Sequence, residues 1–159
     1  MQLELDEFYE SVPEEDKALF SEIADFAYQL GYKPKRAKTQ SVNIVFTNNR
    51  TKKHLLKFSI EHGKPYLKMK FYATAGYSPL FQEAIRAVIE EYNYKYTGCY
   101  QCGKCADELQ GYHYSYPDGR EFFRCGSELI SLPVISREDV PEILKLLHSQ
   151  HQFYIGMLS

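Results

Sequence analysis

Hydrophobic residues recur at helical spacing in three separate parts of the chain. The first part spans about residues 13–30 and begins with acidic residues that suit the positive end of a helix dipole. The second spans about residues 79–92, with Ser78 as N-cap and Pro79 in the first turn. The third follows a capping sequence at residues 136–139. The pattern therefore predicts three helices.

Residues 42–46, 56–60 and 66–72 instead show the alternation of β-strands, and short turn sequences separate them. These stretches predict a three-stranded antiparallel meander. Its apolar positions would face the core, and they are Leu56, Phe58, Ile60, Leu67, Met69 and Phe71. Lys57, Lys68 and Lys70 would then share the opposite face, so that the sheet is apolar on one side and basic on the other.

Two aromatic-rich stretches within residues 111–124 flank a Pro-Asp-Gly turn and predict a β-hairpin. The predicted fold class is therefore α+β: a helix, the meander, a helix, a cysteine-bearing loop with the hairpin, and a C-terminal helix. We expect residues 1–95 to form the core, residues 96–131 an embedded four-cysteine module, and residues 132–159 a helix packed on the same globular unit.

The composition fits one domain, because 159 residues with 44% hydrophobic and 25% charged residues can bury about 68 to 70% of the unfolded surface. The N-terminal residues lack the pattern of a signal peptide, and no apolar run approaches the ~18 residues of a membrane span. The sequence thus predicts a cytoplasmic protein with reduced thiols and no membrane partner.

Four cysteines carry the sharpest chemical signal: Cys99, Cys102, Cys105 and Cys125 form C-x2-C-x2-C followed by one remote cysteine. The pair Cys102-Gly103 is typical of a zinc knuckle, and the hairpin would carry Cys125 back to the loop. Four thiolates around zinc leave no position for water or substrate. The leading hypothesis is therefore a structural zinc site.

Two alternatives stay open for the same four cysteines. A [4Fe-4S] cluster is bound by similar spacing, although Gly126 stands where a proline commonly follows the last cysteine. Metal-free thiols are the other alternative, with Lys104 and Arg124 lowering a thiol pKa. His113 is a less favoured replacement ligand, and His148 and His151 are expected to be exposed residues of the last helix.

Charge is strongly segregated along the chain, although the net charge is only −2. Residues 1–30 hold nine acidic residues and one basic residue, whereas residues 33–70 hold eleven basic residues and one acidic residue. A basic sheet face attracts phosphate, so Lys57, Lys68 and Lys70 are candidate residues for binding a nucleic acid or another polyanion. The acidic first helix is the alternative partner of this face.

The function predicted from the sequence is that of a binding or interaction module, since no phosphate-binding loop, nucleophile elbow or zinc-protease motif is present. An iron-sulfur or thiol redox protein and a polyanion-binding protein are the alternatives. The fourteen tyrosines, several beside the cysteines, would form either a recognition surface or an aromatic shell that packs the cysteine module onto the helices.

Overall fold

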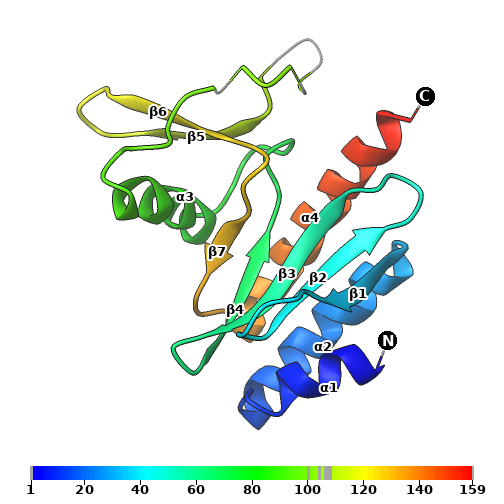
Figure 1. Cartoon of the computed structure of the whole chain (residues 1–159). Helices are drawn as coiled ribbons and strands as arrows, with labels where there is room; N and C mark the ends of the chain where they lie inside the picture. The colour runs from blue at the N-terminus through cyan, green and yellow to red at the C-terminus, as the bar shows by residue number, and fades with distance from the viewer. Residues whose placement is uncertain (1, 100, 104, 106–108, 159) are drawn as a thin grey trace.

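The computed structural model describes residues 2–99, 101–103, 105 and 109–158. The helices formed by these residues are α1 (Gln2–Tyr9), α2 (Glu14–Gln29), α3 (Pro79–Glu91), the 3-10 turn η1 (Arg137–Asp139) and α4 (Val140–Gly156). The strands are β1 (Tyr32–Arg36), β2 (Asn43–Asn48), β3 (His54–Glu61), β4 (Lys64–Met69), β5 (Gly111–Ser115), β6 (Glu121–Cys125) and β7 (Ile130–Leu132). Helices and antiparallel sheet thus make the protein α+β, as predicted (Figure 1).

The main sheet has the order β1-β2-β3-β4-β7, and neighbouring strands are antiparallel. The predicted meander is its centre, β2 to β4, but the prediction of only three strands was wrong because β1 and β7 extend it at both edges. The predicted turn at residues 62–65 is shorter than expected: Glu61 pairs with Lys64, and His62 and Gly63 both have positive φ. A tight two-residue hairpin has this conformation.

Helices α1, α2 and α4 cover one face of this sheet and form the main core (Figure 1). Phe8 of α1 and Phe20 of α2 both pack on Phe58 of β3, with ring centroids 5.1 and 4.9 Å apart. Tilted and edge-to-face ring contacts of this kind bury large apolar areas and fix the helices on the sheet. The helix α1 was not predicted.

The opposite side of the sheet carries α3 and the hairpin β5-β6. Helix α3 contacts β7 and β5, and it begins at Pro79 behind Ser78 as predicted. Phe71, after β4, packs on Phe81 of α3 and on Tyr112 of β5. These aromatic contacts attach the hairpin to the sheet and position the region that holds the cysteines.

The predicted hairpin is confirmed, and its register pairs Gly111 with Cys125 and Ser115 with Glu121. Its turn is closed by a hydrogen bond from the Tyr116 N–H to the Arg120 carbonyl (2.8 Å), and Gly119 has a φ of 92°. A left-handed residue at this point favours glycine. The hairpin therefore returns Cys125 to the level of Gly111, next to the cysteine loop.

The predicted C-terminal helix is α4, and the capping interaction at Ser136 and Asp139 precedes it over η1. Within the described residues, none of the helices is both long enough and apolar enough to cross a membrane.

Candidate functional site

Cys99 and Cys125 follow two residues that pair with each other. Gly98 forms an isolated parallel bridge with Arg124, and the Gly98 N–H donates to the Phe123 carbonyl at 2.6 Å. The bridge is isolated, so it pairs Gly98 with Arg124 and does not include the cysteines themselves. It brings the chain segments that carry the first and the last cysteine of the pattern close together.

Cys102, Cys105 and Cys125 line a common cavity of about 290 Å³. None of the four cysteines is in a disulfide, and Cys102 is exposed while the other three are partly buried. The cavity wall also contains Lys52, Lys53, Lys70, Tyr72 and Tyr154. The cavity thus brings three of the four cysteines together, and Cys99 is not among the residues that line it.

Backbone N–H groups point at two of the sulfur atoms. Gln101 N–H donates to Cys99 Sγ at 3.3 Å, and Gln110 N–H donates to Cys105 Sγ at 3.4 Å. Gln101 and Gly103 both have positive φ, 54° and 77°, so the chain turns sharply on either side of Cys102. Amide groups directed at sulfur stabilise a thiolate, which is the state that binds metal or acts as a nucleophile.

Gly126 is required at its position for a different reason from the one that the Cys-Gly pattern suggested. A Cβ atom there would lie 2.7 Å from the Gln110 carbonyl oxygen and 2.9 Å from the Tyr72 ring. The Gly126 N–H also donates to that carbonyl at 2.9 Å. The glycine therefore lets the chain after Cys125 pack closely against the segment that follows Cys105.

The described residues contain no group of three or more His, Cys, Asp or Glu side chains placed to hold a metal ion. Part of the loop between the cysteines, including Lys104, lies outside the described residues. His113, the replacement ligand that was considered, is exposed and packs on Phe123 with ring centroids 4.9 Å apart. Zinc and [4Fe-4S] therefore both stay predictions for this site.

The lysines of the predicted basic face line two separate cavities. Lys57 and Lys68 line an open cleft of about 550 Å³, whereas Lys70 lines the cysteine cavity and is only 8% exposed. His54 and Ser127 contribute to both cavities. The basic face of the sheet is therefore polar, but it forms the floor of cavities. Helix α3 and the segment after β6 form the walls that shield it from solvent.

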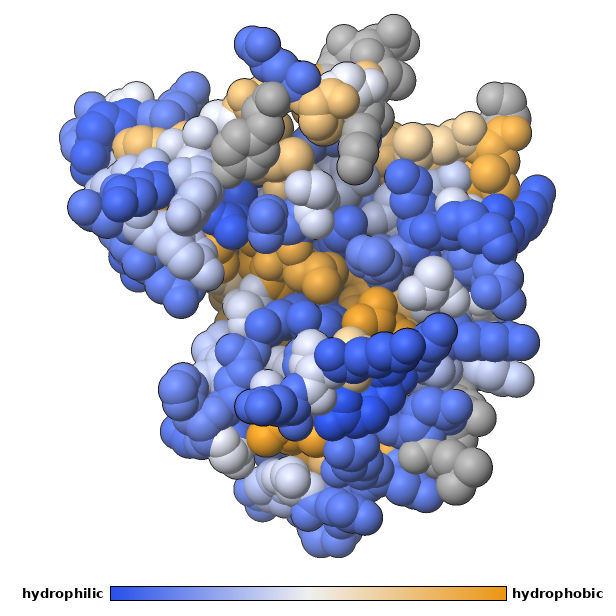
Figure 2. All heavy atoms as spheres, viewed as in Figure 1, coloured by the Kyte–Doolittle hydropathy of each residue, from blue (hydrophilic) through white to orange (hydrophobic). Residues whose placement is uncertain are grey.

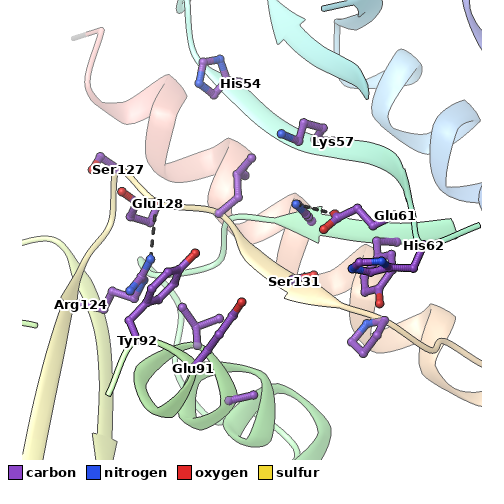
Figure 3. Close-up of a pocket in the computed structure, with 16 residues that line it drawn as sticks. His54, Lys57, Glu61, His62, Glu91, Tyr92, Arg124, Ser127, Glu128 and Ser131 are labelled. Atoms are coloured by element: carbon purple, nitrogen blue, oxygen red, sulfur yellow. Dashed lines mark ion pairs between the residues drawn. The ribbon is translucent and has the colours of Figure 1, made fainter. Parts of the chain in front are cut away.

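The cleft has two walls of different origin. His54, Lys57, Glu61 and Lys68 come from β3 and β4 of the main sheet, while Tyr92 and other residues opposite them come from α3 and from the segment around β6 and β7 (Figure 3). Figure 2 shows hydrophilic side chains around a hollow whose floor is partly hydrophobic. The cleft is thus a feature of the assembled fold and has no local sequence motif.

Lys57 and Lys68 lie directly opposite each other on β3 and β4. Lys68 Nζ is 2.6 Å from a Glu61 carboxylate oxygen, and the Ser59 hydroxyl donates to the same oxygen at 2.8 Å. Burial alone would raise the pKa of Glu61, but these two hydrogen bonds and the charges of Lys68 and Lys57 hold it below its usual value. The Glu61 carboxylate therefore forms its ion pair with Lys68.

Lys57 makes no hydrogen bond or ion pair with the described residues. Burial and the charge of Lys68 lower its pKa, and the charge of Glu61 opposes this effect. His54, at the start of β3, is exposed overall, but partial desolvation of its ring and the charges of Lys70, Lys53 and Lys57 lower its pKa. This wall of the cleft consequently carries more positive charge than its carboxylate neutralises.

Arg124 is the most deeply buried charged side chain of the opposite wall, with 7% of its side chain exposed. Its Nη2 lies 3.6 Å from a Glu128 carboxylate oxygen, and its guanidinium lies over the Tyr92 ring at 5.5 Å from the centroid. Its Nε and Nη1 atoms are buried without a hydrogen-bond partner among the described residues. The sequence alone indicates Arg124 only as a charge that could lower the pKa of a nearby thiol.

Several aromatic side chains around the cysteines pack against other residues of the protein interior. Tyr112 is fully buried, and Tyr72 packs on Tyr112 and on Phe153 of α4. This favours the aromatic shell over an exposed recognition surface. His151 was expected to be exposed, but it is partly buried and its Nδ1 lies 3.0 Å from the hydroxyl of Tyr32, the first residue of β1.

Comparisons with protein-family models, with curated proteins and with solved structures found no match for this chain.

Proposed function

We propose that the protein is a binding module in which Cys99, Cys102, Cys105 and Cys125 hold one structural zinc ion. The zinc would fix the cysteine loop to the end of the hairpin, and the hairpin in turn forms part of one wall of the cleft. The observation that supports this proposal is the bridge between Gly98 and Arg124, since it joins the chain segments that carry Cys99 and Cys125 despite their separation in the sequence.

The hydrogen bonds to sulfur support the same proposal. Two backbone N–H groups point at Cys99 Sγ and Cys105 Sγ, and such second-sphere donors orient thiolate ligands and stabilise their charge. A closed set of four thiolates leaves no open coordination position, so the zinc would stabilise the fold and would not activate a water molecule. A binding role for the protein fits this arrangement better than catalysis at the metal.

The lysines of the cysteine cavity provide a further argument. Zinc with four thiolates carries two negative charges, and Lys52, Lys53 and Lys70 line the cavity in which three of the cysteines lie. Lys70 is only 8% exposed as a whole residue, and its amine has no hydrogen bond or ion pair with the described residues. Because an unpaired buried charge is costly, an anionic metal centre beside Lys70 would explain its position.

The rival proposal is that the same thiolates hold a [4Fe-4S] cluster or cycle as metal-free thiols. The spacing of the first three cysteines suits a cluster, and the exposed Cys102 suits a reactive thiol. Metal analysis and a visible spectrum of protein purified without air distinguish these states. Zinc without colour supports our proposal, iron with sulfide and a brown colour supports a cluster, and metal-free protein with four titratable thiols supports thiol chemistry.

Anion binding is the second candidate function, and the uncompensated charge of the cleft favours it. Lys57 lacks an ion-pair partner among the described residues, and two donor atoms of Arg124 are buried without acceptors. Binding of a nucleic acid through Lys57, Lys68 and Lys70 has less support, because Lys70 lines the other cavity and Lys68 is paired with Glu61. Salt-dependent binding of an oligonucleotide that weakens when these lysines are replaced by Gln would favour the nucleic-acid version.

A further inference from the structure

We propose that the 550 Å³ cleft binds a small ligand that carries a phosphate or carboxylate group, with Arg124 as its anchor and Lys57 as a second contact. This inference deepens the proposed binding function by naming the ligand class. It rests on that function in one respect: the zinc site would hold Cys125, and therefore the adjacent Arg124, in place.

The first argument comes from the unsatisfied donors of Arg124. The guanidinium is buried over Tyr92, yet Glu128 approaches only Nη2, and at 3.6 Å the contact is longer than a hydrogen bond. Nε and Nη1 have no acceptor among the described residues. Buried arginine donors are nearly always paired, and their planar geometry matches the two oxygens of a carboxylate or phosphate. A bound oxyanion would supply acceptors to the guanidinium once a shift of the side chain turns these covered donors toward the cleft.

The second argument comes from the opposite wall. Lys57 and Lys68 are directly opposed on paired strands, an arrangement that is unfavourable for like charges. Glu61 neutralises Lys68 and leaves Lys57 without an ion-pair partner among the described residues. Figure 3 shows Lys57 and Arg124 on different walls of the same cleft. An anion in the cleft would reduce the repulsion on one wall and meet the arginine on the other.

The third argument concerns the size of the ligand. Ligand pockets of small molecules have volumes of about 300 to 1,000 Å³, and this cleft falls within that range. Glu61, Glu91 and Glu128 also line it, so an extended polyanion that ran along the cleft would meet three carboxylates. A compact ligand contacts the cations without covering every carboxylate. The ring of Tyr92 and the hydroxyls of Ser127 and Ser131 are further contacts for such a molecule.

The experiment titrates the full-length protein, as purified with its metal, with inorganic pyrophosphate, with tricarballylate, and with a single-stranded oligonucleotide of about 20 nucleotides. Calorimetry measures the affinity, and nitrogen-15 NMR follows the Arg124 Nε–H signal. We expect at least one small anion to bind and to shift this signal. Lys57→Gln should weaken the binding about tenfold, and Arg124→Lys at least as much.

Lys145→Gln is the matched control, because Lys145 is an exposed residue of α4 and the variant removes the same charge. Lys57 is partly exposed, so Lys57→Gln tests the inference even if Arg124→Lys does not fold. The inference is overturned if neither small anion binds, if Lys57→Gln and Lys145→Gln weaken binding equally, or if only the oligonucleotide binds. Zinc-loaded protein without anion binding overturns this inference alone, whereas metal-free protein that binds pyrophosphate overturns only the zinc proposal.

Discussion

Lys70 and Cys125 line the same cavity, and Lys70, which is only 8% exposed, makes no side-chain hydrogen bond or ion pair with the described residues. Burial and the charge of Lys53 lower the pKa of Lys70, while Cys125 and Glu128 act in the opposite direction. A buried amine in this position destabilises the fold unless negative charge is held close to it. The relationship therefore links the charge of the cysteine site to the stability of the whole protein.

Lys70→Met should have opposite effects on the metal-free and the zinc-loaded protein. Without metal, the variant removes an unpaired buried charge, and we expect the free energy of unfolding to rise by about 1 kcal/mol. With zinc, it removes the cation that compensates the thiolates, and we expect a loss of similar size together with weaker zinc retention. Thermal denaturation with and without a chelator measures both effects. Equal changes in melting temperature with and without zinc would contradict an electrostatic interaction between Lys70 and the zinc site. Lys64→Met, at the exposed start of β4, is the control.

Gly126→Ala should destabilise the protein, because its Cβ would lie 2.7 Å from the Gln110 carbonyl oxygen and 2.9 Å from the Tyr72 ring. Overpacking of this kind costs about 1 to 3 kcal/mol. Chemical denaturation measures the loss, and metal content should fall with it because the strain is next to Cys125. Gly156→Ala is the control, since nothing lies within 4 Å of its added Cβ. Unchanged stability of Gly126→Ala would show that the two segments are not closely packed.

Acid should destabilise the metal-free protein through His151. Partial burial and the charge of His148 lower the His151 pKa below the ordinary value of 6.5, and the ring meets the Tyr32 hydroxyl at 3.0 Å. The unfolded chain then binds more protons than the folded chain below about pH 7, so stability falls as pH falls through that range. Stability stops falling only when the pH is below the pKa of His151 in the folded protein.

His151→Gln should flatten this dependence when unfolding is measured between about pH 7 and pH 5 in chelator. The same substitution at His113, an exposed residue of β5, is the control. Chelator is needed because protons also compete with metal for thiolates. A slope that is identical in the wild type and in His151→Gln would remove His151 from the explanation.

The elements that the sequence predicted well have strong local signals. Ser78 with Pro79, and Ser136 with Asp139, mark helix starts that the structure confirms. The strand β1 was missed because Pro34 and the lysines around it are unfavourable in a central strand, but β1 is an edge strand, where proline is tolerated. The strand β7 has three residues, too few for a periodic pattern. Helix α1 presents only a short apolar stripe, with Leu5 and Phe8 buried.

The two candidate sites also differ in how far the sequence alone predicts them. The cysteine pattern is local and could be recognised from spacing alone. The cleft requires β7 to pair with β4 and α3 to pack on β7, and these long-range contacts cannot be derived from periodicity. For this reason the sequence placed Lys57 and Lys68 on one face correctly but could not reveal the buried Arg124 opposite them.

The metal content of protein purified without air, measured together with its thermal stability, tests the central claim most directly. The account predicts about one zinc ion per chain and no visible colour. It also predicts that Cys125→Ala lowers zinc content and melting temperature together, because binding and folding are coupled. A protein without zinc, or a Cys125→Ala variant that keeps both its zinc and its melting temperature, would contradict the account.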